Sequence, residues 1–81
     1  MLDSLKTHKK AVGVKQSLNC VEAGNAKAVY IAKDADDKVV APLKDLCQRK
    51  AVTVIYVESM KALGKACSID VGAAAAALLK E

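Results

Sequence analysis

The chain has 81 residues, 53% of them hydrophobic, which predicts a single folded domain over residues 1–81 rather than a disordered segment. No apolar run reaches the ~20 residues needed to span a bilayer, and the amino terminus carries no apolar signal region, so neither a membrane protein nor a secreted one is expected. The net charge of +4 arises within residues 1–33, which hold six lysines and two acids. This bias favours a nucleic acid or another polyanion as partner, although a generic basic surface has the same composition.

Cysteine and histidine are too sparse and scattered for a disulfide framework or a zinc site. Cys20, Cys47 and Cys67 share no C-x-x-C spacing, and His8 is the only histidine. We therefore expect buried, reduced thiols in a cytoplasmic protein, with no metal and no cofactor. Aromatic residues make up only 2% of the chain, so base stacking on aromatic platforms is not expected. A protein of this composition that binds RNA should read groove edges and shape.

The first predicted elements lead into a polar helix. A short helix is predicted over residues 4–10, and a brief strand over residues 10–13. Val14, Leu18 and Val21 then recur at helical spacing, which predicts an amphipathic helix with these three residues buried.

The amino end of that helix is unusual. Gly13 precedes it, and Lys15 and Gln16 occupy the first turn, where the helix dipole favours acids. Free helical amides and donor-rich side chains, beside a glycine that permits close approach, suit an anionic partner. The alternative is the solvated face of an ordinary surface helix. Gly24 is placed to end the helix.

The middle of the chain predicts two buried strands separated by helical pieces. Residues 26–32 and 53–57 are nearly continuous apolar segments rich in strand formers. Between them, the acids of residues 34–37 suit helix caps better than a metal cluster. Pro42 interrupts the helical pattern that follows, which predicts one piece to about Ala41 and a second over Pro42–Lys50.

The carboxyl-terminal part predicts one more helix and one ambiguous element. Ser59 is expected to cap a helix from Met60 to about Cys67. Alanine propensity favours a helix over residues 72–79, although small residues equally suit a central strand. The alternation of helices and strands indicates an α/β sandwich. The chain holds neither a G-x-G-x-x-G motif nor a nucleophile paired with a histidine motif, so an enzyme is not expected.

Three segments carry a resemblance to a known family: Gly13-Val14-Lys15-Gln16, Ile31-Ala32-Lys33-Asp34-Ala35-Asp36, and residues 58–75. With these, the chain resembles the kink-turn RNA-binding ribosomal proteins, the group of archaeal protein seven-Ae and eukaryotic protein thirty-e, and especially the small bacterial members of the YbxF and YlxQ type. The resemblance implies a three-layer α-β-α sandwich around a mixed four-stranded sheet. It also makes the alanine-rich tail a strand, against its propensity.

The implied function is recognition of a kink-turn, a bent RNA helix with tandem sheared G·A pairs beside a bulge. An ordinary A-form major groove is too narrow for side chains, but the kink opens it and exposes guanine O6 and N7. Lys15 and Gln16 match the family positions that read those edges. Ile69, Asp70 and Val71 match a loop that meets the bulge, Asp36 and Met60 match positions around a flipped-out base, and Lys33 and Lys65 are implied phosphate contacts. Gly13, Val14 and Asn19 complete the implied interface.

The chain departs from the family pattern at several of these positions. Many members carry asparagine and glutamate in place of Lys15 and Gln16, and lysine in place of Asn19. Ser68 stands where glycine is usual, which costs on the order of 1 kcal/mol if that residue is left-handed. Asp70 is shorter than the common glutamate. The protein is expected to be monomeric and to bind rRNA, a riboswitch or a similar RNA; the alternative is a scaffold in a ribonucleoprotein with only nonspecific RNA affinity.

Overall fold

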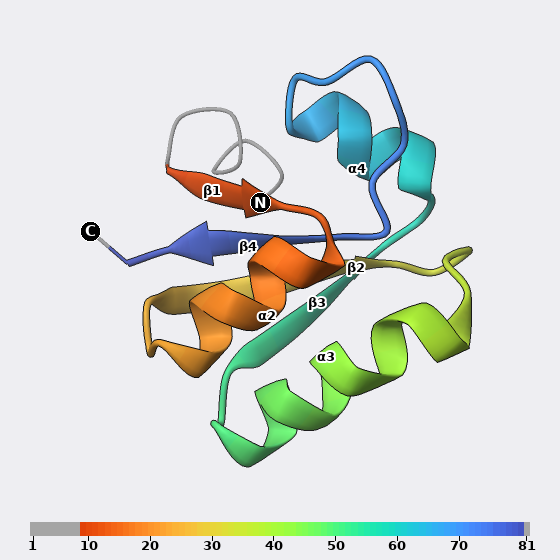
Figure 1. Cartoon of the computed structure of the whole chain (residues 1–81). Helices are drawn as coiled ribbons and strands as arrows, with labels where there is room; N and C mark the ends of the chain where they lie inside the picture. Colours follow the sequence, from red (N-terminus) through yellow and green to blue (C-terminus); the bar gives the residue numbers. More distant parts are fainter. Residues whose placement is uncertain (1–8, 81) are drawn as a thin grey trace.

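Residues 9–80 are described by a computed structural model, in which strands alternate with helices (Figure 1). The elements are β1 (Lys10–Val12), α2 (Val14–Glu22), β2 (Ala26–Ala32), α3 (Asp37–Arg49), β3 (Thr53–Val57), α4 (Met60–Ala66) and β4 (Ala75–Leu79). The brief first strand is confirmed. The helix predicted over residues 4–10 lies almost entirely outside the described residues, and its last residue belongs to β1.

The strands form one mixed sheet in the order β1-β4-β2-β3. β2 and β3 are parallel, with Ala28 opposite Thr53 and Ala32 opposite Val57. β4 lies between β1 and β2 and is antiparallel to both. The first three strands therefore share one direction, and β4 runs against them. This arrangement confirms the mixed four-stranded sheet that the family resemblance implied.

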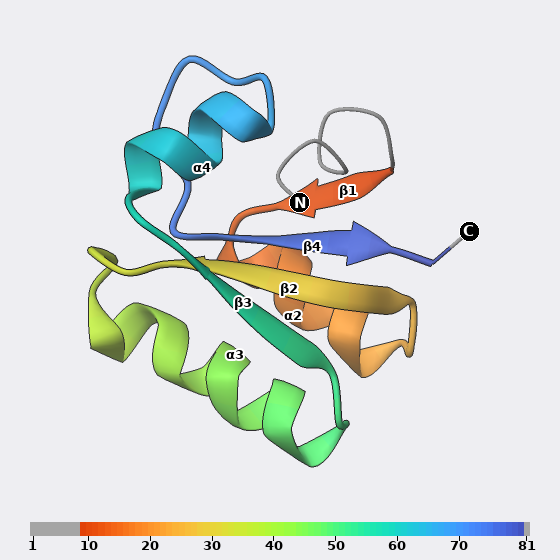
Figure 2. The same cartoon turned by 180° about the vertical axis from the view of Figure 1, so that it is seen from behind.

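Helices cover both faces of the sheet. α2 and α3 lie together on one face, and α4 packs on the other at one end of the strands (Figures 1 and 2). Tyr56 of β3 faces the α3 side, where the Lys44 ammonium lies 5.4 Å from the centroid of its ring. β2 is buried along its whole length apart from Lys27, as a strand between two helical layers must be. The predicted three-layer α-β-α sandwich is thus confirmed.

The alanine-rich tail is the central strand β4. Ala75, Ala76 and Ala77 are completely buried, between β1 on one side and β2 on the other. Alanine alone favours a helix, but pairing with two strands satisfies the backbone of this segment inside the sheet. The small side chains also let α2 pack closely on β4. Tertiary context therefore overrides propensity here.

The buried side of α2 differs from the predicted stripe. Val21 is buried, but Val14 and Leu18 are only half-buried, and the small residues Ser17 and Cys20 are buried in their place. A strand of alanines brings the helix close, and small side chains fit that contact best. The predicted stop is confirmed: Gly24 has φ +78°, and its N–H donates to the Val21 carbonyl as in a Schellman cap.

The predicted break at Pro42 is wrong, because α3 is one helix through this residue. Proline removes one helical donor and leaves the Lys38 carbonyl without its intrahelical partner. Lys38 and Pro42 are both exposed, so water can reach the Lys38 carbonyl. The inner face, with Val40 and Leu43 on either side of the proline, is fully buried and holds the helix together.

β3 is not the buried strand that its composition predicts. It lies at the edge of the sheet, and only Val57 of its residues is buried, while Thr53 is exposed and Tyr56 is 51% exposed. An apolar run of this length occurs both in central strands and in edge strands, so the residue pattern does not distinguish them. Strand order, which the run itself does not encode, decides between them.

Candidate nucleic-acid interface

The candidate site lies where the first three strands end. Because β1, β2 and β3 share one direction and β4 opposes them, the residues after three strands and before the fourth meet at one end of the sheet. The amino ends of α2, α3 and α4 lie there as well (Figure 1). We call this region the loop end; it comprises residues 13–16, 33–36, 58–60 and 69–74.

Backbone hydrogen bonds join these segments to one another. The Gly13 N–H donates to the Ala75 carbonyl at 2.8 Å, which ties the start of α2 to the start of β4. The Lys33 N–H donates to the Val57 carbonyl at 2.8 Å, and the Ala73 N–H donates to the Met60 carbonyl at 3.0 Å. Segments that carry the predicted RNA contacts are therefore held in one fixed arrangement, although they are far apart in sequence.

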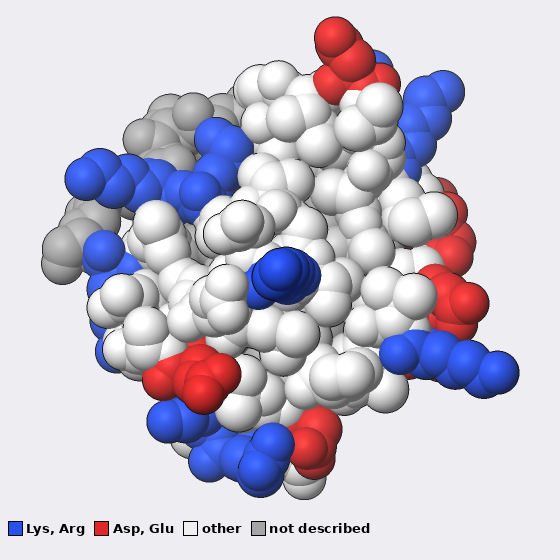
Figure 3. Space-filling model, viewed as in Figure 1, with Lys and Arg blue, Asp and Glu red and all other residues white. Residues whose placement is uncertain are grey.

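The amino end of α2 is open. Gly13, its N-cap residue, has φ +100° and ψ 159°, a conformation essentially restricted to glycine, and makes no side-chain cap. The first turn holds no acid, and both Lys15 and Gln16 are exposed. Figure 3 shows a basic side chain projecting from the middle of the face that carries α2, surrounded by uncharged atoms. Amides, a lysine and a glutamine thus present donors to the solvent.

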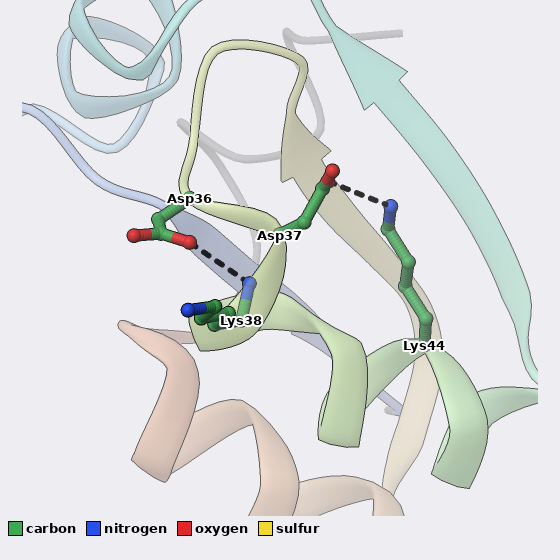
Figure 4. Close-up of polar contacts among 4 residues, drawn as sticks. All are labelled: Asp36, Asp37, Lys38 and Lys44. Atoms are coloured by element: carbon green, nitrogen blue, oxygen red, sulfur yellow. Dashed lines mark hydrogen bonds and ion pairs between the residues drawn. The ribbon is translucent and has the colours of Figure 1, made fainter.

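The other two helices that begin at the loop end are closed by their own side chains. The Asp36 carboxylate accepts from the Lys38 N–H at 2.9 Å and caps α3 (Figure 4). The Ser59 hydroxyl accepts from the Ala62 N–H at 3.0 Å and caps α4, as predicted. The carboxylate of Asp34 also accepts at α4, from the Met60 N–H at 2.7 Å. This bond spans 26 residues and leaves no local signal in the sequence.

The expectation that these acids cap the following helix is confirmed for Asp36. Asp34 does not cap that helix, because its carboxylate binds the first N–H of α4 instead. Asp37 instead lies in the first turn of α3, where an acid is favoured, 3.8 Å from the Lys44 ammonium (Figure 4). Within residues 9–80, no group of three histidine, cysteine or acidic side chains is arranged to hold a metal ion.

The loop between α4 and β4 is folded back onto α4. A Cβ at Gly64 would collide with the Val71 carbonyl, so only glycine lets the loop approach this closely. The Ile69 N–H donates to the Gly64 carbonyl at 3.0 Å. Ser68 has φ +63°, so the strained conformation considered for this non-glycine residue is confirmed. The loop consequently has a defined shape and presents Val71, which is 70% exposed.

A shallow hollow of about 250 Å³ lies beside this loop. It is lined by Lys61, Lys65, Ile69, Asp70 and Val71. All three predicted loop contacts and the predicted phosphate contact Lys65 therefore share one concave surface, which has two apolar residues, two lysines and one acid. Lys61 was not singled out in the sequence, although its spacing of four residues from Lys65 on a helix would have placed the two ammonium groups together.

Most, but not all, of the predicted RNA contacts meet at the loop end. The loop end contains ten of the twelve: Gly13, Val14, Lys15, Gln16, Lys33, Asp36, Met60, Ile69, Asp70 and Val71. Asn19 is exposed one turn further along α2, about 6 Å from Lys15 by helical rise, so it lies at the margin. Lys65 is in the last turn of α4, outside the loop end, and adjoins it by lining the same hollow as the loop 69–71.

The three thiols take no part in this surface. Cys20, Cys47 and Cys67 are free and buried, as predicted, and burial raises the pKa of each above its ordinary value of 9.0. The charge of Lys10 partly opposes this shift in the pKa of Cys67. None of the helices in residues 9–80 is long and apolar enough to cross a bilayer.

Comparison with known families gives a match over nearly the whole chain. The model of the ribosomal protein L7Ae/L30e/S12e/Gadd45 family matches residues 2–81. An RNA-binding protein of Caldanaerobacter subterraneus subsp. tengcongensis is 48% identical over 69 residues, which cover 85% of this chain and 84% of the relative. The RNA-binding protein YbxF of Geobacillus stearothermophilus is 41% identical over 76 residues, covering 94% and 93% of the two chains.

A solved structure agrees with these relatives. The 15.5kD RNA binding protein of Giardia lamblia superposes with a TM-score of 0.92 at 32% sequence identity. The match covers 99% of this chain and 71% of the Giardia chain. The sheet order and helix placement described above are therefore those of a known fold.

Proposed function

The chain belongs to the ribosomal protein L7Ae/L30e/S12e/Gadd45 family, and from that premise we propose that it binds RNA through the loop end and recognises kink-turns. The relatives named above are RNA-binding proteins, and none of their names denotes an enzyme. The observation that carries the proposal is the open amino end of α2, where Lys15 and Gln16 are exposed beside uncapped amides.

Lys15 and Gln16 read the RNA bases in this proposal. Both side chains carry hydrogen-bond donors, and guanine O6 and N7 are acceptors that sheared G·A pairs expose in an opened major groove. The free amides of α2 and the dipole of that helix then hold a phosphate of the same strand. Gly13 lets the RNA backbone come close, since it has no side chain and nothing lies within 4 Å of its Cβ position.

The rest of the loop end holds the bulge. Ile69 and Val71 offer apolar contact to unstacked nucleotides, and Asp36 and Met60 border the place where a flipped-out base would lie. Lys33 and Lys65 neutralise phosphates, which adds affinity without sequence preference. These roles follow the positions that the family resemblance implies. The loop's fixed shape on Gly64 supports them, because an ordered loop loses less conformational entropy on binding.

A pair of matched RNAs tests the proposal. One RNA carries a kink-turn, and in the other the tandem G·A pairs are replaced by Watson–Crick pairs. We expect the protein to bind the first about tenfold more tightly or better, because specific base readout is worth about 1–3 kcal/mol per contact. Equal binding to both RNAs would reduce the function to nonspecific RNA affinity, and a lack of binding to either at low salt would favour a scaffold role in a ribonucleoprotein.

The cellular setting of the proposal is the cytoplasm, with a structured RNA such as rRNA or a riboswitch as partner and with one protein chain on each kink-turn. Crosslinking the protein to cellular RNA and sequencing the adducts identifies that RNA. Recovery of a kink-turn sequence supports the proposal. Recovery of RNA without any shared motif contradicts it.

A further inference from the structure

Asp34 joins two parts of the loop end that are remote in sequence. Its carboxylate accepts a hydrogen bond from the Met60 N–H at 2.7 Å, so the β2–α3 connection is tied directly to the first residue of α4. We propose that Asp34 is a positioning residue for RNA recognition: it fixes the start of α4 so that the loop after α4 takes the shape that RNA requires. This inference rests on the proposed function.

Met60 links Asp34 to that loop. Its N–H donates to Asp34, and its carbonyl accepts from the Ala73 N–H at 3.0 Å. Gly72 packs against it so closely that a Cβ there would lie 3.2 Å from the Met60 Cβ. Val71, the exposed tip of the predicted contact loop, directly precedes Gly72. A shift of Met60 therefore displaces Ala73 and Gly72, and with them the preceding residue Val71.

The bond from Asp34 is not needed to form α4. Ser59 caps the helix independently through the Ala62 N–H, and its carbonyl accepts the Leu63 N–H at 3.0 Å. On the other side, the Lys33 N–H stays anchored to the Val57 carbonyl of β3. Loss of the carboxylate at Asp34 should therefore leave the elements folded and release only the tie between them.

The charge of Asp34 makes the inference easy to distinguish from simple electrostatics. The residue is an exposed acid on the surface proposed to meet phosphates. If charge alone mattered, its removal would strengthen RNA binding, because an acid repels the phosphate backbone. A positioning role predicts that removal of the carboxylate weakens binding to the kink-turn. Affinity for RNA that is bound nonspecifically should not fall.

The experiment compares Asp34→Ala, Asp34→Asn and, as a charge-matched control, Asp37→Ala. Asp37 is an acid at the same end of the sheet whose side chain is 93% exposed. Dissociation constants are measured for the kink-turn RNA and for its Watson–Crick counterpart. We expect Asp34→Ala to weaken kink-turn binding about tenfold, from the loss of a charge-assisted bond, without weakening binding to the counterpart. Asp34→Asn, which keeps an acceptor oxygen, should stay within about threefold of the original protein. Asp37→Ala should bind both RNAs equally well or slightly better.

Two results would overturn the inference from the RNA side. The first is that Asp34→Ala binds both RNAs as well as the original protein does, or more tightly. The second is that Asp34→Asn loses as much kink-turn affinity as Asp34→Ala, since the accepted bond would then be irrelevant.

A measurement without RNA separates this inference from the proposed function. Amide hydrogen exchange in the free protein should become faster at Ala73 in Asp34→Ala and stay unchanged in Asp37→Ala, because only the first change releases Met60. Unchanged exchange at Ala73 in Asp34→Ala overturns the link. If the unaltered protein fails to prefer the kink-turn, the proposed function fails, while the exchange result still decides whether Asp34 positions the loop.

Discussion

The amino ends of α2, α3 and α4 lie at the same end of the sheet, but they differ in their N-caps. α3 begins at Asp36 and α4 at Ser59, and in each case the side chain accepts a backbone N–H of the first turn. α2 begins at Gly13, which offers no side chain, and no acid follows in its first turn. The molecule closes two helix ends with its own groups and leaves one end open.

This difference separates stability from recognition. A capped helix end has its amides satisfied, and the cap stabilises the fold by about 1 kcal/mol. An uncapped end keeps its amides for water or for another molecule. At α2 the opening is built into the backbone, because the Gly13 N–H is bound to Ala75 and its φ of +100° excludes the usual capping residues. Removal of the exposed donor side chains at the open end should therefore weaken RNA binding with little effect on stability, and removal of a capping side chain should lower stability with little effect on RNA binding.

The largest effect is expected at the open end, for Gln16→Ala. The side chain is exposed, so the free energy of unfolding should change little, whereas kink-turn binding should weaken by about 1–3 kcal/mol through the loss of a base contact. Filter binding with the two matched RNAs measures this. Gln48→Ala is the control, because Gln48 is an exposed glutamine near the far end of α3. Equal weakening with both RNAs would show that Gln16 does not read bases.

Gly13→Ala tests whether the open end depends on backbone conformation. Nothing lies within 4 Å of the Cβ position, so the cost is that of the strained dihedral angles alone, about 1–3 kcal/mol in the free energy of unfolding. Gly24→Ala is the matched comparison, because its φ of +78° falls in the milder left-handed region and its Cβ position is also open. Urea denaturation should show the larger loss for Gly13→Ala; equal losses would remove the special role of this glycine.

A closed end should show the opposite behaviour. Ser59→Ala removes the cap of α4 and should lower the free energy of unfolding by about 1 kcal/mol. Preference for the kink-turn over its Watson–Crick counterpart should persist, because the Asp34 bond still holds Met60. Thermal unfolding and binding to both RNAs check the two halves of this expectation. Loss of preference without loss of stability would break the distinction between open and closed ends.

The smallest effect is expected for Lys65→Ala, in the last turn of the capped helix α4. A lysine that contacts a phosphate contributes charge alone, so affinity should fall for both RNAs and the slope of log K against log[salt] should decrease by about 1. Lys50→Ala is the control, since this exposed lysine follows α3 at the opposite end of the sheet. An unchanged slope would remove Lys65 from the set of phosphate contacts.

The sequence by itself determined the local elements and their chemistry. Apolar periodicity and cap residues gave β2, α4 and the amphipathic α2, because these signals act over a few residues. Lys15 and Gln16 stood out for the same reason, as donors in a turn that favours acids. Their assignment to base readout came from the family resemblance and remains a prediction.

Tertiary structure decided what depends on neighbours remote in the chain. The alanines of β4 form a strand because β1 and β2 pair with them, and Thr53–Val57 is half exposed because it lies at the sheet edge. α3 continues through Pro42 because its inner face is packed on the core. The bond from Asp34 to Met60 spans 26 residues. Propensity and spacing describe only short stretches of chain, whereas these features are fixed by pairing and packing across the fold.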